Sequence, residues 1–309
     1  MPRLVTAADG RGMRSVRVGM DWFYKAPDDE SGLFIDYDSR AMTTTNRVTV
    51  GGRTFRYLES GAGWPVVLIH AFPLNAEMWR PQLRLVPHGF RFIAPDLRSF
   101  GESDVEAAPL PTMDDYAADI GGLLDALEIE RAVIGGLSMG GYVTFALFRA
   151  APERFSGMLL ADTRSQADTP AGRESRRTMS QLVLTEGTRA VADQMIPKLL
   201  GETTRREYPD IATLVRQVIE ANHPAAIEGA LNALMTRPDS TPDLGRIDCP
   251  TLIVVGSEDT LTPPADSQAL HEAISRSHLV VVPAAGHLSS LEDAEGFSTA
   301  LEDFLRSSI

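Results

Sequence analysis

The stretch Val133–Tyr142, VIGGLSMGGY, decides the fold of this chain. A short β-branched run leads into a Gly-x-Ser-x-Gly turn, and apolar residues at helical spacing follow, so Ser138 is predicted to lie where a strand becomes a helix. Gly136 and Gly140 flank the serine where a larger side chain would collide with the sharp turn that lifts the hydroxyl out of the sheet. The amides that open the helix would stabilise negative charge on a substrate oxygen. The stretch therefore predicts a nucleophilic serine, and its context argues against a glycine-rich loop that merely holds one.

Strand-like runs alternate with helical patterns on both sides of this stretch. Short apolar or alternating runs predict eight strands, at 47–50, 53–58, 66–69, 92–94, the run before Ser138, 158–161, 251–255 and 279–282. A helix from Thr112 to Leu127 is predicted to begin with a capping box, because Asp115 follows Thr112 by three residues. Strands separated by helices predict an α/β fold with a mostly parallel eight-stranded sheet and helices on both faces.

Between residues 163 and 249 the strand pattern stops. Apolar residues at three- and four-residue spacing predict three or four helices there, around 173–184, 190–200, 211–221 and 224–234. We therefore predict a helical cap over 163–249, inserted into a core made of 42–162 and 250–309. Residues 1–41 lack apolar periodicity and are predicted to be a poorly ordered N-terminal extension. Two interpretations of it remain open: an upstream start codon with the folded domain opening at Met42, or an arginine-rich transit peptide.

The composition excludes several classes of function. The apolar and charged fractions, 43% and 23%, are those of an ordinary globular protein. The formal net charge of −13 opposes binding to nucleic acid or to anionic membranes. No apolar run approaches the ~18 residues of a membrane span and no hydrophobic signal segment opens the chain, so we predict a cytoplasmic location. The single cysteine, Cys249, is predicted to be buried, and no cluster with metal-ligand spacing indicates a metal.

Three loops at the carboxyl ends of predicted strands carry the groups of a catalytic triad. Ser138 follows one strand, Asp259 follows the first strand after the cap, and His287 follows the last strand. This order is the one expected when such a sheet holds a triad. His287 would take the proton from Ser138 as general base, and Asp259 would orient the imidazole. A fourth loop would supply the Phe72 amide, which with the Met139 amide would form an oxyanion hole.

From about Arg47 to its end, the chain resembles the α/β-hydrolase superfamily. The motifs that carry the resemblance are HAFPL at 70–74, DLRSFGES at 96–103, GLSMGG at 136–141, GSED at 256–259 and GH at 286–287. Within the superfamily, GLSMGGYV and LLADTR are similar to small bacterial serine esterases and to 3-oxoadipate enol-lactonase-like enzymes. Ala71 and Ser99 depart from the pattern, since relatives usually have glycine there. We expect the Ala71 methyl to narrow the pocket and Ser99 to change only a turn.

The residues and the resemblance together predict a serine hydrolase that cleaves a carboxylic ester or lactone through an acyl-enzyme, without a cofactor. One alternative is a C–C bond hydrolase or perhydrolase that uses the same triad. Another, from a different class, is a low-turnover ligand receptor on the hydrolase fold. The triad acid also has an alternative: some relatives use the position of Asp162, and Asp259 could merely cap the next helix.

Substrate contacts are expected on and near the cap. Arg164 is the cation nearest the end of the strand before the cap and could pair with a substrate carboxylate, as an enol-lactone would require; a solvated arginine is the competing interpretation. The predicted pocket walls, which could instead be only the core of the cap, are Met179, Leu182, Met195, Ile196 and Leu199. The predicted partner is a small-molecule ester or lactone, not nucleic acid or a membrane, and homo-oligomerisation remains open.

Overall fold

The computed structural model describes residues 42–106 and 108–309, and the predicted N-terminal extension lies outside these residues. The described part contains an eight-stranded sheet in the order β1-β2-β4-β3-β5-β6-β7-β8. The pairs β1–β2 and β2–β4 are antiparallel and the other neighbouring pairs are parallel. The strands are β1 (Thr44–Val50), β2 (Arg53–Gly61), β3 (Gly63–Ile69), β4 (Gly89–Pro95), β5 (Ala132–Leu137), β6 (Phe155–Ala161), β7 (Thr251–Gly256) and β8 (Ser277–Val282). The predicted mostly parallel sheet is confirmed.

Burial along the strands explains the sequence pattern. Every residue of β5 and of β7 is buried, as expected for central parallel strands that are covered on both faces. Strand β1 instead alternates between exposed and half-buried residues at the edge of the sheet. It joins β2 through Gly51 and Gly52, whose φ angles of 57° and 83° suit glycine in a two-residue hairpin turn.

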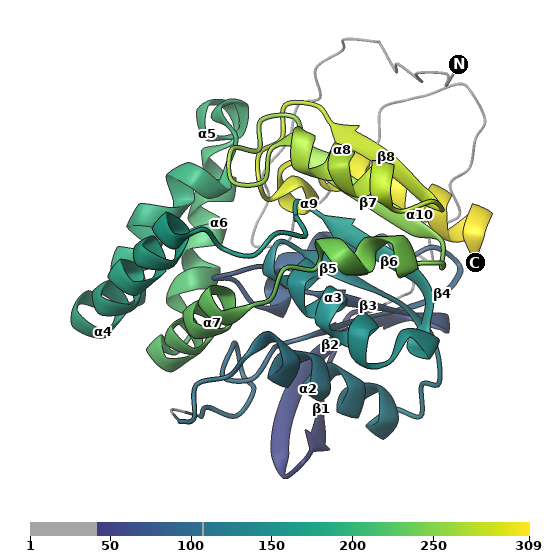
Figure 1. Cartoon of the computed structure of the whole chain (residues 1–309), viewed down its shortest axis with the longest axis horizontal. Helices are drawn as coiled ribbons and strands as arrows, with labels where there is room; N and C mark the ends of the chain where they lie inside the picture. Colours follow the sequence, from purple (N-terminus) through teal and green to yellow (C-terminus); the bar gives the residue numbers. More distant parts are fainter. Residues whose placement is uncertain (1–41, 107) are drawn as a thin grey trace. The chain divides into compact units, whose positions relative to one another are not determined.

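Helices cover both faces of the sheet, as predicted (Figure 1). One face carries α2 (Met113–Ala126), α3 (Met139–Ala150) and α8 (Pro264–Ala273), and the other carries α1 (Arg80–Arg84), α9 (Ser289–Glu292) and α10 (Ala294–Ser308). Three short 3₁₀ helices, η1 (Ala76–Trp79), η2 (Pro152–Arg154) and η3 (Thr241–Arg246), lie in the connections. The predicted capping box at the start of α2 is confirmed, because the Thr112 and Asp115 side chains each accept a hydrogen bond from the other's backbone amide.

Four helices lie between β6 and β7, and we call them the cap helices: α4 (Pro170–Leu199), α5 (Glu202–Glu207), α6 (Pro209–Glu220) and α7 (Pro224–Thr236). Helix α4 is kinked between the two segments that the sequence predicts as separate helices, 173–184 and 190–200. The break between them is local: Gly187 has non-helical angles, φ 80° and ψ −175°. Helix α4 packs against α6 and α7 (Figure 1). The division into core and cap domains stays a prediction.

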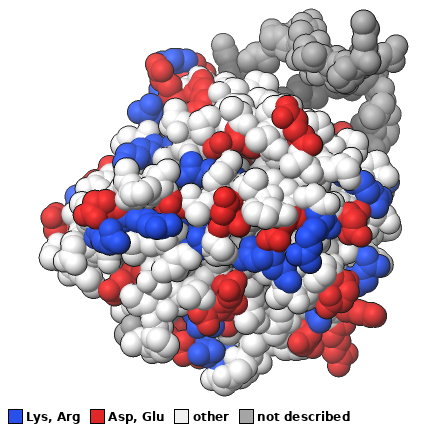
Figure 2. Space-filling view, in the orientation of Figure 1, with Lys and Arg blue, Asp and Glu red and all other residues white. Residues whose placement is uncertain are grey.

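The surface and the single cysteine agree with an ordinary globular protein. On the face drawn in Figure 2, Lys and Arg side chains are interspersed with Asp and Glu side chains. Among the described residues, no helix combines the length and the apolar character needed to cross a membrane. Cys249 is free and buried, and burial raises the pKa of its thiol to about 11, so the thiol stays protonated near neutral pH.

Candidate active site

Ser138 occupies the turn between β5 and α3 in a strained backbone conformation. Its φ of 56° and ψ of −107° are rare for a residue with a side chain, and such strain is typical of functional sites. The flanking glycines make the turn possible. A Cβ on Gly136 would lie 2.3 Å from the Ile69 carbonyl oxygen, and one on Gly140 would lie 2.2 Å from the same atom. Because the obstacle is backbone, a side chain at either position would force the strand and the helix apart.

The structure brings Ser138, His287 and Asp259 together from loops that follow three different strands. His287 Nε2 lies 2.8 Å from Ser138 Oγ, and His287 Nδ1 lies 2.8 Å from Asp259 Oδ2. With Asp259 ionised, Nδ1 carries the proton and donates to the carboxylate, which leaves Nε2 free to accept from the Ser138 hydroxyl. The arrangement can therefore withdraw a proton from the serine as it attacks an electrophile.

Four hydrogen bonds hold the Asp259 carboxylate in place. Oδ1 accepts from the amides of Leu261 at 2.8 Å and Thr262 at 3.0 Å, while Oδ2 accepts from the Thr262 hydroxyl at 2.6 Å and from His287. Burial alone would raise the pKa of Asp259, but the His287 charge and the bonds from His287 and Thr262 outweigh it, so the pKa is lowered. The Asp259 carboxylate thus stabilises the conformation of its own loop and also contacts the His287 imidazole. Thr262 was missed by sequence reasoning, although a hydroxyl three residues after an aspartate is typical of such turns.

Asp162, the alternative triad acid, directly follows β6. Its carboxyl group is fully buried and accepts from the Gly256 amide at 2.9 Å and from the Ser289 hydroxyl. Among the described residues it makes no hydrogen bond with His287. Burial, reinforced by the nearby Asp259 charge, raises the pKa of Asp162 well above its ordinary value. Asp162 therefore links the end of β6 to β7 and to the first residue of α9.

The amides predicted for the oxyanion hole are buried and free to donate. Met139 is the first residue of α3, so its amide has no acceptor within the helix. The Phe72 amide has no acceptor among the described residues.

The loop that carries Phe72 is held by a residue between the cap helices α6 and α7, because Asn222 Nδ2 donates to the Pro73 carbonyl at 2.9 Å. Asn222 Oδ1 also accepts from Asn75 at 3.0 Å and from the Gly101 amide at 2.9 Å, a role that its isolated position after α6 did not indicate.

The two departures from the family pattern have different consequences. Ala71 is fully buried in the core and does not line the cavity beside Ser138, so the expectation that its methyl narrows the pocket is wrong. Ser99 has a φ of 68°, a left-handed conformation that explains why glycine is usual there. Its hydroxyl accepts from the Glu106 amide at 2.9 Å, which stabilises the turn.

His70, before the oxyanion loop, is a buried hydrogen-bonding residue. Its Nε2 accepts from the Leu97 amide at 3.1 Å, its Nδ1 lies 3.1 Å from the Ala71 carbonyl oxygen, and its ring packs edge-on against Phe100. Burial lowers the pKa of His70 from 6.5 to about 4, because a charged imidazole would lose its water shell.

We expect His70 to make the fold sensitive to acid. Above pH 6.5 neither state holds the extra proton, but between pH 6.5 and 4 the unfolded chain binds it and the folded protein does not. The free energy of unfolding should therefore fall with pH across this window, by at most roughly 3 kcal/mol. Urea denaturation at several pH values tests this. The His70→Gln variant should be less stable at every pH, but its free energy of unfolding should change less with pH between 6.5 and 4. Replacing the exposed His88 by Gln should leave the dependence of the free energy of unfolding on pH unchanged. Equal slopes for His70→Gln and the parent protein would contradict the assignment.

A cavity of about 170 Å³ lies beside Ser138 and His287, beneath the cap helices. Four of the predicted substrate-contact residues line it: Arg164, Met179, Met195 and Leu199. Leu182 and Ile196 do not; both pack with the apolar core instead, since Ile196 lies about 100° round the helix from Met195. The lining also contains Phe72, which was predicted for the oxyanion hole. The other lining residues were not predicted as site residues: Tyr142, Asp168, Gly172, Ser175, Arg176, Lys198, Leu234, Leu261 and Thr262. The described residues contain no group of three or more His, Cys, Asp or Glu side chains placed to hold a metal ion.

Comparisons with known proteins identify relatives of this chain. A family model described as the alpha/beta hydrolase fold matches residues 65–294. The structure of a thermophilic esterase from Thermogutta terrifontis, with malate bound, is 38% identical, and the match covers 86% of this chain and 99% of that one with a TM-score of 0.82. The 3-oxoadipate enol-lactonase 2 of Acinetobacter baylyi is 27% identical over 78% of this chain and 88% of its own length. A non-heme chloroperoxidase of Streptomyces lividans is 33% identical over 66% of this chain and 78% of its own length.

Proposed function

The chain belongs to the α/β-hydrolase family, and from that premise we propose that it hydrolyses short carboxylic esters or lactones through an acyl-enzyme on Ser138. The observation that carries the proposal is the pair of 2.8 Å contacts that link Ser138, His287 and Asp259 beside a cavity. The similarity to an esterase and to an enol-lactonase supports a hydrolase, and ester or lactone cleavage is the reaction that this geometry serves best.

In the proposed reaction, Ser138 Oγ attacks the carbonyl carbon while His287 Nε2 takes the hydroxyl proton. The carbonyl oxygen becomes an oxyanion and would accept from the Phe72 and Met139 amides, an arrangement worth ~3 kcal/mol per donor. The bond to the leaving oxygen then breaks, and His287 gives its proton to that oxygen. In the second half, His287 deprotonates a water molecule that attacks the acyl-enzyme and releases the acid.

The cavity supports short substrates. Its volume of about 170 Å³ lies below the ~300 Å³ at which pockets for drug-sized ligands begin. Met179, Met195 and Leu199 give it apolar walls, and the flexible methionines can adjust to different acyl groups. We propose that acyl chains of a few carbons fit and that long fatty acyl chains do not.

A substrate panel on the purified chain tests the proposed function. Short acyl esters and lactones should turn over repeatedly, each turnover releasing one acid, and a fluorophosphonate should label Ser138 rapidly and stop the reaction. Rapid labelling without sustained turnover of any ester or lactone would favour the ligand-receptor alternative. Faster hydrolysis of vinylogous diketones than of every ester tested would favour C–C bond cleavage.

Perhydrolysis is the second candidate, and the similarity to a non-heme chloroperoxidase favours it. The same acyl-enzyme would be attacked by hydrogen peroxide in place of water, so that a peroxy acid leaves instead of an acid. Acetate with hydrogen peroxide, in the same panel, separates the two: peroxy acid formation that outpaces ester hydrolysis would make this the principal reaction.

A further inference from the structure

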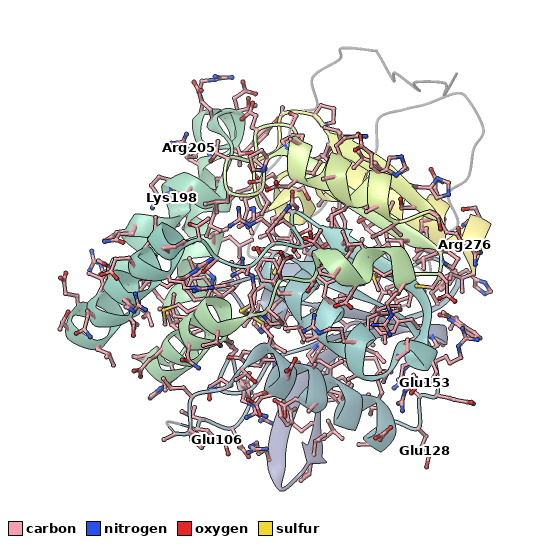
Figure 3. All side chains as sticks on the ribbon, viewed as in Figure 1. Glu106, Glu128, Glu153, Lys198, Arg205 and Arg276 are labelled. Atoms are coloured by element: carbon pink, nitrogen blue, oxygen red, sulfur yellow. The ribbon has the colours of Figure 1, made fainter. Side chains whose placement is uncertain are left out.

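The cavity beside Ser138 carries a surplus of positive charge. Three cations line it, Arg164, Arg176 and Lys198, against a single carboxylate, Asp168, outside the catalytic residues. Lys198 lies in the last turn of α4, where Figure 3 labels it, and makes no ion pair with any residue that the structure describes. The whole chain is acidic, so a basic cavity runs against its average charge.

Asp168 does not cancel this surplus, because another arginine already neutralises it. Arg237 Nη1 donates to Asp168 Oδ1 at 2.7 Å, and only 3% of its side chain is exposed. The Arg237 guanidinium also donates to two backbone carbonyls and stacks 4.2 Å from the centre of the Tyr142 ring. Burial alone would raise the pKa of Asp168, but the charges of Arg176 and Arg237 outweigh it and lower the pKa, so the group is ionised. Asp168 and Arg237 thus form a fixed, neutral pair in which Asp168 lines the cavity and Arg237 does not.

Arg164 has hydrogen-bond donors to spare. None of them has a hydrogen-bond acceptor within residues 42–106 and 108–309, and Nε is buried without a partner. The nearest carboxylate oxygens, on Asp266 and Asp168, lie 3.9 Å and 4.0 Å from its terminal nitrogens, beyond hydrogen-bond distance. About two thirds of the side chain is buried, with 32% exposed. A guanidinium held in a cavity without acceptors is typical of a site for an anionic ligand.

Arg176 places a second cation close to the reacting groups. Its Nε donates to Asp168 at 3.2 Å, which fixes the side chain and leaves both terminal nitrogens without acceptors among the described residues. The guanidinium carbon lies 5.9 Å from the centre of the Phe72 ring, so it faces the loop that carries the proposed oxyanion amide. An anion held by Arg164 and Arg176 would therefore share one small cavity with the bond to be broken.

We infer that Arg164 and Arg176 form an anion subsite that selects short esters or lactones carrying a carboxylate. This inference rests on the proposed function and names its substrate class. The subsite binds the carboxylate by charge-assisted hydrogen bonds, Asp168 and Arg237 fix its geometry, and the ester carbonyl faces Ser138. The apolar walls formed by Met179, Met195 and Leu199 contact the short carbon chain between the two groups.

Matched substrates test the subsite. Ethyl hydrogen glutarate is compared with ethyl pentanoate, and 3-acetoxypropanoate with propyl acetate, so that the carboxylate sits in the acyl part or in the alcohol part. The carboxylate-bearing member of at least one pair should have a kcat/KM at least about 10-fold higher, expressed mainly in KM. Arg164→Gln and Arg176→Gln should each lower the ratio of the two kcat/KM values within that pair by about 10-fold. Arg173→Gln is the matched control, because Arg173 is exposed on the same helix and does not line the cavity.

A binding measurement separates this inference from the proposed function. Calorimetric titration of the Ser138→Ala protein with glutarate should give saturable binding. The Kd for glutarate should rise about 10-fold or more in the double variant Ser138→Ala/Arg164→Gln and stay unchanged in the double variant Ser138→Ala/Arg173→Gln. Glutarate binding with this dependence, in a protein that hydrolyses no ester, would leave the subsite standing and overturn the proposed function. Ester hydrolysis without preference for the carboxylate in either pair, together with no arginine-dependent glutarate binding, would overturn the subsite alone.

Discussion

Replacing Ser138 by alanine should lower the kcat for a short p-nitrophenyl ester by roughly 10⁴- to 10⁶-fold. The variant loses the hydroxyl that lies 2.8 Å from His287 Nε2, so no acyl-enzyme can form on residue 138. Residual hydrolysis should reflect only the oxyanion amides and substrate binding. The measurement is a steady-state rate, accompanied by mass spectrometry of the protein after a fluorophosphonate treatment, which should find no adduct.

Ser175→Ala provides the matched control for this experiment. Ser175 also lines the cavity and is exposed on α4, but it makes no contact with His287 that the structure records. We expect its kcat to stay within about threefold of the parent value, as for a surface substitution away from the reacting groups. A Ser138→Ala protein that retains even a hundredth of the parent rate would show that another group is the nucleophile.

Replacing Asp259 by asparagine should lower kcat by about 10⁴-fold with little change in the stability of the fold. An asparagine that keeps its oxygen toward the Leu261 and Thr262 amides turns its NH₂ toward His287, which then presents the wrong tautomer to the serine. The loss should be in kcat rather than in KM, because Asp259 does not line the cavity. Stopped-flow acylation rates and circular dichroism of the variant measure the two effects separately.

Asp162→Asn is the decisive comparison for the choice of acid. Burial raises the pKa of Asp162, and an asparagine keeps the size of this buried group without a charge. The amide oxygen can still accept from the Gly256 amide, and we therefore expect a loss of less than about 10-fold. A greater loss of kcat in Asp162→Asn than in Asp259→Asn would transfer the orienting role to Asp162.

The sequence predicted those parts of the molecule that local pattern controls. The wholly apolar runs of β5 and β7 and the two-glycine turn after β1 each have a local physical cause, and the structure has all three. Ser138, Asp259 and His287 could be predicted to lie in one site, because each follows a strand of the sheet and parallel strands end at the same edge. Their catalytic roles stay predictions until the substitutions above are measured.

The cap was harder to predict, because its contacts join residues far apart in the chain. Asp168 and Arg237 are separated by 69 residues, and nothing in the periodicity of either segment indicates that they pair. The kink at Gly187 separates the two helices that the sequence predicts within α4, but the packing of α4 against α6 and α7 depends on contacts between distant segments. Arg176 precedes the buried Met179 by three residues on α4, and only the folded chain reveals that both side chains line the cavity.

The tie between Asn222 and the Pro73 carbonyl has a consequence for engineering. A lid transplanted from a relative would bring its own helices but not this amide, so the loop beneath it would lose its anchor. Chimeras should be designed to retain Asn222, or to graft an equivalent hydrogen-bond donor, before their altered selectivity is interpreted. A segment exchanged between relatives should therefore leave Asn222 together with the Pro73 loop that it holds.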